Sequence, residues 1–238
     1  MQKIPTVKTA TPPLSDWLSQ YAAAGGVLDY VLFESVDPAR VDYDFHRQAA
    51  IAALQAIDRQ LEDDALETSQ ETGYPLDDFF RLTFDLENMN GQLLTVEQFL
   101  GPYYSRSAQR FIVPGRAPHH QFPVQHYFLA GDRQVPENIV PLQLPETDNE
   151  FHTLGYADAF LGPPHGVNLS LETELTPLFH QINHLAFGAF SDSLEIYEWA
   201  GDWSNYFDAG FEWWGAYLWT ICDRATGAIA AIGASTTD

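Results

Sequence analysis

The sequence predicts an α+β fold: a single globular domain in which several amphipathic helices pack on a mainly antiparallel sheet with a C-terminal β-hairpin. Apolar residues recur at helical spacing in the first half of the chain, and short runs rich in β-branched and aromatic residues close the second half. No linker or internal repeat divides the 238 residues. We therefore expect residues 1–13 to form a polar N-terminal arm and residues 14–238 to form one domain.

Helix start and stop signals predict the elements of the N-terminal half. Ser15 can cap a short helix that Gly25 ends, and the apolar residues 27–36 predict a buried strand. The clearest element is an amphipathic helix over residues 46–66, with apolar side chains at steps of three and four. Two more helices are expected, at residues 75–86 and at residues 95–100 with Thr95 as the cap.

Proline changes the pattern in the middle of the chain. Nine of the fifteen prolines lie in residues 101–164, so we expect short strands there rather than long elements. The expected elements, in order, are strands at 110–113 and 124–130, helices at 149–161 and 177–190, and strands at 194–199, 213–222 and 228–232. Thr176 is the expected cap of the second helix, and residues 223–227 the turn between the last two strands.

Composition excludes several classes of function. The chain has 11 Lys and Arg against 33 Asp and Glu, a net charge of −22, so DNA, RNA and anionic membranes are improbable partners. Its 45% apolar content separates it from disordered acidic chains. The single Cys222 forms no intramolecular disulfide, and the first 14 residues lack the apolar run of a signal peptide, so we expect a cytoplasmic protein. No phosphate-binding or nucleophile motif is present, and we expect no cofactor.

Residues 192–223 combine aromatic and acidic side chains. They hold five of the six tryptophans and seven acids, with no Lys or Arg. One interpretation is a core hairpin with aromatic residues inside; a second is an exposed surface that recognises a basic partner; a third is sugar binding by stacking on tryptophan. The second assigns partner binding to Asp202, Trp203, Tyr206, Asp208 and Glu212. The oxygen-rich spacing does not match an EF-hand, so we expect an ordinary turn and no metal.

Residues 98–131 have the opposite character. They contain no acid, three arginines and three histidines. They could line a pocket for a small anion, clamped by arginine side chains. The residues assigned to that role are Arg106, Arg110, Arg116 and His119. Alternatively, these cations pair with the carboxylates of the rest of the fold.

Two histidines, His180 and His184, stand one helical turn apart. A zinc protease would carry Glu directly after the first histidine, where this chain has Gln181. We therefore expect partly buried, hydrogen-bonded histidines rather than metal ligands.

Three functional hypotheses follow, and none assigns a catalytic residue. The first is an acidic protein that binds a basic protein partner, in the manner of a bacterial immunity protein that inhibits a cationic toxin. The second is an enzyme or binding protein for a small anionic molecule or a glycan, using residues 106–126 or 192–223. In the third, the acidity is a solubility device of a salt-adapted proteome and indicates no partner. The sequence predicts no oligomeric state.

Overall fold

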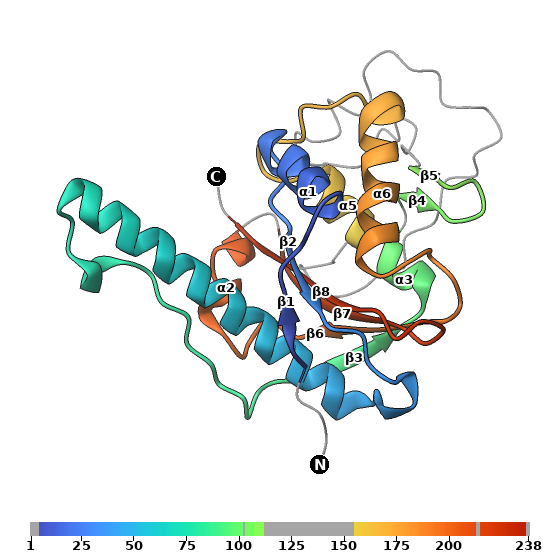
Figure 1. Ribbon diagram of the computed structural model, residues 1–238, viewed down its shortest axis with the longest axis horizontal. Coiled ribbons are helices and arrows are strands. Elements are labelled where there is room, and N and C mark those ends of the chain that lie inside the picture. Colours follow the sequence, from blue (N-terminus) through green and yellow to red (C-terminus); the bar gives the residue numbers. More distant parts are fainter. Residues whose placement is uncertain (1–4, 102, 112–154, 213–214, 237–238) are drawn as a thin grey trace.

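A six-stranded antiparallel sheet, in the order β1-β2-β8-β7-β6-β3, forms the centre of the computed structural model (Figure 1). The structure describes residues 5–101, 103–111, 155–212 and 215–236. The strands are β1 (Val7–Lys8), β2 (Asp29–Phe33), β3 (Gly91–Leu94), β6 (Leu194–Trp199), β7 (Ala216–Asp223) and β8 (Ile229–Ser235). A separate ribbon pairs β4 (Tyr104–Ser105) with β5 (Arg110–Phe111).

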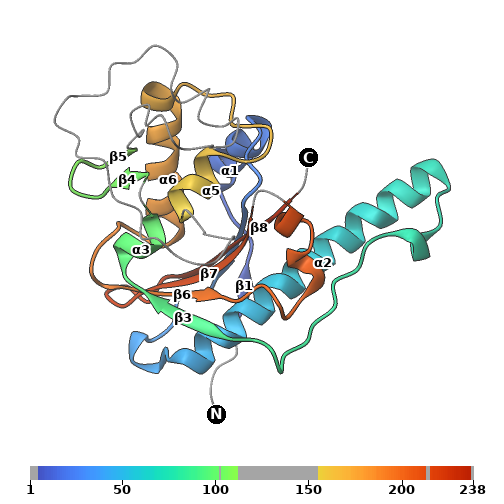
Figure 2. The ribbon, with the colours of Figure 1, turned by 180° about the vertical axis from the view of Figure 1, so that it is seen from behind.

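Helices cover both faces of the sheet. One face packs against α1 (Leu14–Ala23), α3 (Val96–Leu100), α5 (Tyr156–Leu161) and α6 (Thr176–Ala186). The long helix α2 (Tyr43–Thr72) lies across the other face, as the view from behind also shows (Figure 2). The short helical turns are η1 (Pro38–Arg40), η2 (Leu76–Asp78), η3 (Leu171–Leu175), η4 (Asn205–Phe207) and η5 (Gly210–Glu212). The core is therefore divided by the sheet into two apolar layers.

Strand β7 shows why both faces must be covered. Its side chains alternate, so Trp219 and Ile221 enter the layer beneath α5 and α6, while Leu218 and Cys222 enter the layer beneath α2. All four are fully buried. A strand that is apolar on both sides requires a layer of helices on each side.

The predicted α+β fold, with helices on an antiparallel sheet and a C-terminal hairpin of β7 and β8, is confirmed. The expected cap of α3 is also found, because Thr95 and Gln98 form a reciprocal capping box. Within the predicted N-terminal arm, residues 7 and 8 form the edge strand β1. The expected strand at 124–130 and the start of the helix at 149–161 lie outside the described residues.

Three local predictions are wrong. Ser15 does not cap the first helix, because α1 begins at Leu14, with Pro13 at the N-cap position and no capping hydrogen bond from a side chain. Residues 75–86 form the single turn η2 and then an extended segment, because side chains bind the amides that a helix would use: the N–H of Leu82 donates to Asp58 and that of Thr83 to Asn205. Thr176 does not cap α6. The π-helical turn η3 precedes it, and the Thr176 hydroxyl donates to the Leu171 carbonyl at 2.6 Å.

A buried polar network joins α2 to the sheet. The hydroxyl of Thr220, on the otherwise apolar face of β7, lies 2.9 Å from His46 Nδ1 and accepts a hydrogen bond from Trp199 Nε1 at 3.0 Å. His46 Nε2 lies 3.2 Å from Glu195, which also binds Arg224. Burial lowers the pKa of His46, so its imidazole is neutral at neutral pH.

This network predicts the effect of Thr220→Val. Valine keeps the shape but removes the oxygen, which leaves two buried nitrogen atoms, in His46 and Trp199, without that partner. We expect the free energy of unfolding, measured with urea at pH 7.5, to fall by about 2 kcal/mol. Thr220→Ser keeps the oxygen and is expected to lose less than half as much. A valine variant as stable as the native chain would contradict the assigned role of the hydroxyl.

Candidate functional site

Two aromatic residues that the sequence assigns to partner binding lie in the core. Trp203 is 0% exposed and packs near Phe84 and Phe207, and Tyr206 is 7% exposed. The Tyr206 hydroxyl donates to Asp29 Oδ2 at 2.9 Å. For these two residues the core interpretation of the segment is the correct one, because their rings fill the layer beneath α2.

The acids of the same predicted set lie differently. Asp202 and Asp208 are exposed. Glu212 ends the turn η5, and its side chain lies outside the described part of the chain. Among the four side chains of this set that the structure describes, the two aromatic rings are buried and the two carboxylates are exposed, so a basic partner would meet only the carboxylates.

Of the predicted anion-binding residues, the structure describes Arg106 and Arg110. Arg106 is already paired: its guanidinium binds Glu97 at 2.9 Å and Asp192 at 2.6 Å, and its Nε donates to the Phe190 carbonyl. These carboxylates raise the pKa of Arg106 further. Arg110 is exposed on β5. Arg116 and His119 lie outside the described residues. For Arg106, the alternative of pairing within the fold is the observed one.

A different surface combines exposed acidic and apolar side chains. The C-terminal part of α2 extends beyond the sheet, and the chain then returns through η2 toward the body (Figures 1 and 2). We call residues 59–81 the acidic projection. It carries two arginines, Arg59 and Arg81, and seven acids. Those acids are Glu62, Asp63, Asp64, Glu67, Glu71, Asp77 and Asp78, all of them exposed.

The acids of the projection repel one another. Asp63, Glu67 and Glu71 follow at steps of four along α2, so like charges are neighbours on one side of the helix. Arg81 forms an ion pair with Glu62 within the projection. Each like-charge pair at this spacing costs the helix a few tenths of a kcal/mol. The projection therefore holds a destabilising charge pattern.

The apolar side chains of the projection point to solvent as well. Leu66 is 44% exposed, Tyr74 55%, Leu76 39% and Phe80 55%. The Tyr74 ring meets Phe79 edge-on, with centroids 5.6 Å apart. Large apolar side chains grouped within a rim of charge are typical of interaction surfaces.

Local interactions hold the projection in shape. Gly73 adopts a φ of 75°, which ends α2 and lets the chain reverse, and Ser69 donates to the Tyr74 carbonyl at 2.7 Å. Ala65 is buried at 5% exposure, and at the base the Asp58 carboxylate binds the returning chain. The exposed side chains are thus presented on a structured element rather than on an unsupported loop.

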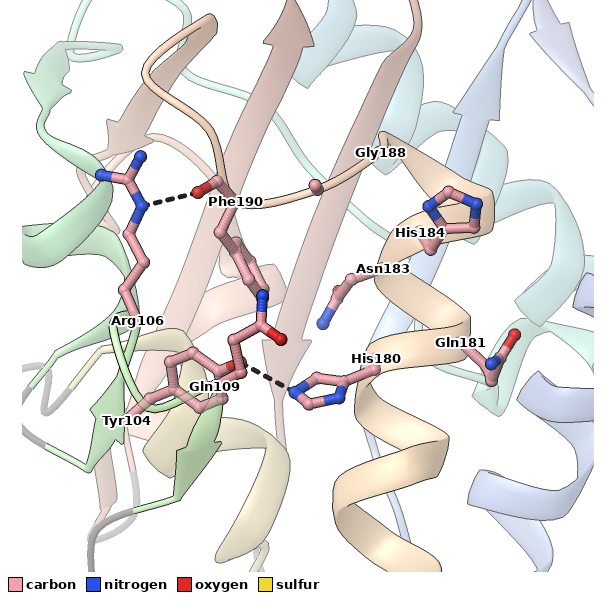
Figure 3. A pocket seen from close by; sticks show the side chains of 10 residues that line it. Tyr104, Arg106, Gln109, His180, Gln181, Asn183, His184, Gly188 and Phe190 are labelled. Atoms are coloured by element: carbon pink, nitrogen blue, oxygen red, sulfur yellow. Dashed lines mark hydrogen bonds between the residues drawn. The ribbon is translucent and has the colours of Figure 1, made fainter.

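A pocket of about 420 Å³ lies on the opposite side of the sheet, between α6, the β4-β5 ribbon and the loop after α6 (Figure 3). Its lining residues are Tyr104, Arg106, Gln109, His180, Gln181, Asn183, His184, Gly188, Ala189 and Phe190. None of them is acidic. In a chain of net charge −22, the absence of acids among the described lining residues is a local departure from the average surface.

Two side chains in the pocket form a neutral hydrogen-bonded pair. The Tyr104 hydroxyl lies 2.8 Å from His180 Nε2. Burial raises the pKa of Tyr104 to about 12 and lowers the pKa of His180, so both are uncharged at neutral pH. The expectation of a hydrogen-bonded, partly buried histidine is confirmed for His180 and wrong for His184, which is exposed.

Comparison with family models, curated proteins and solved structures gave no match for this chain. None of the helices in the described residues combines the length and apolar character that a membrane span requires. The same part of the chain contains no group of three or more His, Cys, Asp or Glu arranged to hold a metal ion.

Proposed function

We propose that the chain binds a protein with a basic surface through the acidic projection. The observation that carries the proposal is the exposure of Tyr74 and Phe80 within a stretch that holds seven acids. Aromatic side chains supply most of the binding energy at many interfaces, while surrounding charge accelerates the encounter and selects the partner. The projection offers both on one structured element.

The charge pattern supports a basic partner over a second copy of this chain. Two projections brought together would each contribute a net charge of −5. A partner rich in Lys and Arg would instead relieve the repulsion among Asp63, Glu67 and Glu71. The three carboxylates that repel one another in the free chain would then attract the partner in the complex.

The exposed rings also distinguish binding from mere solubility. An acidic surface that serves only solubility or salt adaptation gains nothing from large exposed apolar side chains, which promote association. In the narrower form of the proposal, the chain is a cytoplasmic inhibitor that, like an immunity protein, neutralises a cationic protein. The single Cys222 is in keeping with a reducing compartment.

Selection of peptides from a random displayed library on the immobilised chain tests this function. Counter-selection uses the variant Asp63→Asn, Asp64→Asn, Glu67→Gln, Glu71→Gln, so that only ligands of the projection survive. We expect enriched peptides that join several Lys or Arg with Trp, Leu or Phe, and whose binding weakens with salt. Enrichment without basic residues, or no enrichment over the counter-selected variant, would contradict the proposal.

A further inference from the structure

The pocket contains a buried polar group that lacks a partner. Asn183 is 2% exposed, and its Oδ1 accepts a hydrogen bond from the Tyr156 hydroxyl at 2.5 Å. Its Nδ2 has no hydrogen-bond partner among the described residues. Buried side-chain amides nearly always pair both ends, so an unused donor beside a cavity requires an explanation.

Hydrogen bonds to the oxygen of the Asn183 amide fix the orientation of this donor. The Tyr156 hydroxyl lies 2.6 Å from that of Tyr30, so a chain of two hydroxyl groups holds the oxygen end of the Asn183 amide. The nitrogen end then points away from Tyr156 and into the pocket, between α6 and Phe190 (Figure 3). Hydrogen bonds in such a chain polarise one another, which strengthens Nδ2 as a donor.

The other walls define what can occupy the space. The rings of Tyr104 and Phe190, with centroids 5.6 Å apart, form an aromatic wall. The Arg106 guanidinium is satisfied by Glu97 and Asp192, so it offers no free charge for a ligand. Recognition in this pocket therefore combines an amide donor with aromatic surface, and a strongly charged clamp is absent from its described lining.

We propose that this pocket binds a small molecule that presents a carbonyl or carboxylate oxygen on a flat ring. The oxygen accepts from Asn183 Nδ2, and the ring packs on Phe190 and Tyr104. The cavity, at about 420 Å³, lies in the range of small-ligand sites. This site is independent of the acidic projection, which lies on the other side of the sheet.

Binding of three probes of similar size to the full chain tests the proposal. Benzamide and benzoate carry the acceptor oxygen, and benzylamine carries none. We expect saturable shifts of the Asn183 side-chain amide resonance in NMR spectra with benzamide or benzoate, and none with benzylamine. The ratio of the two affinities shows whether the pocket favours a neutral or an anionic acceptor. Equal binding of all three, or of none, would overturn the proposal.

Variants separate the donor from general packing. At pH 8, which favours the ionised carboxylate, Asn183→Asp still accepts from Tyr156 but has no donor for the ligand, so we expect at least a tenfold weaker affinity for benzamide. The control Asn168→Asp changes an exposed asparagine outside the pocket lining and should leave the affinity unchanged. Should Asn183→Asp fail to fold, Ala189→Trp blocks the pocket from an exposed position and should abolish binding. Binding that survives the blocking variant would place the probes elsewhere and overturn the site.

Discussion

Replacing Asp29 and Asp158 with asparagine is expected to stabilise the protein at pH 8. Burial raises the pKa of Asp29 to about 6 and that of Asp158 to about 7, so both are ionised at pH 8 in surroundings that disfavour the charge. A pKa difference of one corresponds to about 1.4 kcal/mol, so removing the charge can stabilise the fold by at most roughly 3 kcal/mol at Asp29 and 4 kcal/mol at Asp158. Because the amide also loses hydration, we expect at least about 1 kcal/mol from each substitution.

The sign of the pH dependence follows from linkage. The folded chain holds a proton on these two carboxyl groups more tightly than the unfolded chain does, so stability falls as the pH rises from about 4 to about 7. His46 acts in the opposite direction. Burial lowers its pKa, so the unfolded chain takes up that proton first and stability falls as the pH drops below about 6.5. The difference between native chain and variant cancels the His46 contribution.

Urea unfolding at pH 5 and pH 8 measures this effect. The gain in the free energy of unfolding should be larger at pH 8 than at pH 5, by up to about 4 kcal/mol for the two substitutions together. The matched control Asp202→Asn removes an exposed carboxylate and should change stability little at either pH. A double variant that is no more stable than the native chain at pH 8 would show that solvent reaches Asp29 and Asp158 in the folded state.

Neutralising the acidic projection is expected to weaken binding of a selected basic peptide by about 100-fold. The variant Asp63→Asn, Asp64→Asn, Glu67→Gln, Glu71→Gln removes four charges, each worth about 0.5–1 kcal/mol against a cationic partner. The loss should appear mainly in the association rate and should shrink at 0.5 M salt, where screening is strong. Binding kinetics measured at 0.05 and 0.5 M salt provide the test.

A matched variant, Asp16→Asn, Glu87→Gln, Asp202→Asn, Asp208→Asn, removes the same charge from exposed sites elsewhere. Its loss of binding free energy for the peptide should be less than a fifth of the loss in the projection variant. Two of its sites belong to the segment at 192–223. A loss of affinity equal to that of the projection variant would therefore indicate that this segment takes part in partner binding. The double variant Tyr74→Ala, Phe80→Ala should instead raise the dissociation rate at either salt concentration.

The sequence predicted the sheet and the helices where local signals agree with packing. The capping box at Thr95 and the turn after Asp223 are both defined by nearby residues, and both occur as expected. The helix over residues 46–66 was predicted in position but not in length. Its real limits are Asp42, whose side chain accepts the Phe45 N–H, and Gly73.

Two of the failures share one physical cause, which is that tertiary contacts override local preference. The segment at 75–86 has helical spacing, but its amides bind side chains at residues 58 and 205 that are distant along the chain. Likewise, the density of aromatic and acidic residues at 192–223 could not show which side chains point inward. Trp203 and Tyr206 do so because α2 covers that face of the sheet.

The acidic projection could have been recognised from a different signal. Residues 62–78 contain seven acids and no base, and a helix extended past residue 66 would carry them beyond the body of a domain this size. What the sequence could not supply is the exposure of Tyr74 and Phe80, which depends on where the returning chain packs. The pocket depends on a similar long-range contact, between Asn183 and Tyr156.

Hydrogen–deuterium exchange of the full chain, with and without a peptide selected on it, tests the central claim most directly. If the projection is the binding surface, amide protection should increase in residues 59–81. Exchange in residues 192–212 and in α6 should stay the same. Protection confined to residues 192–212 or to α6, with none in 59–81, would contradict the assignment of partner binding to the acidic projection.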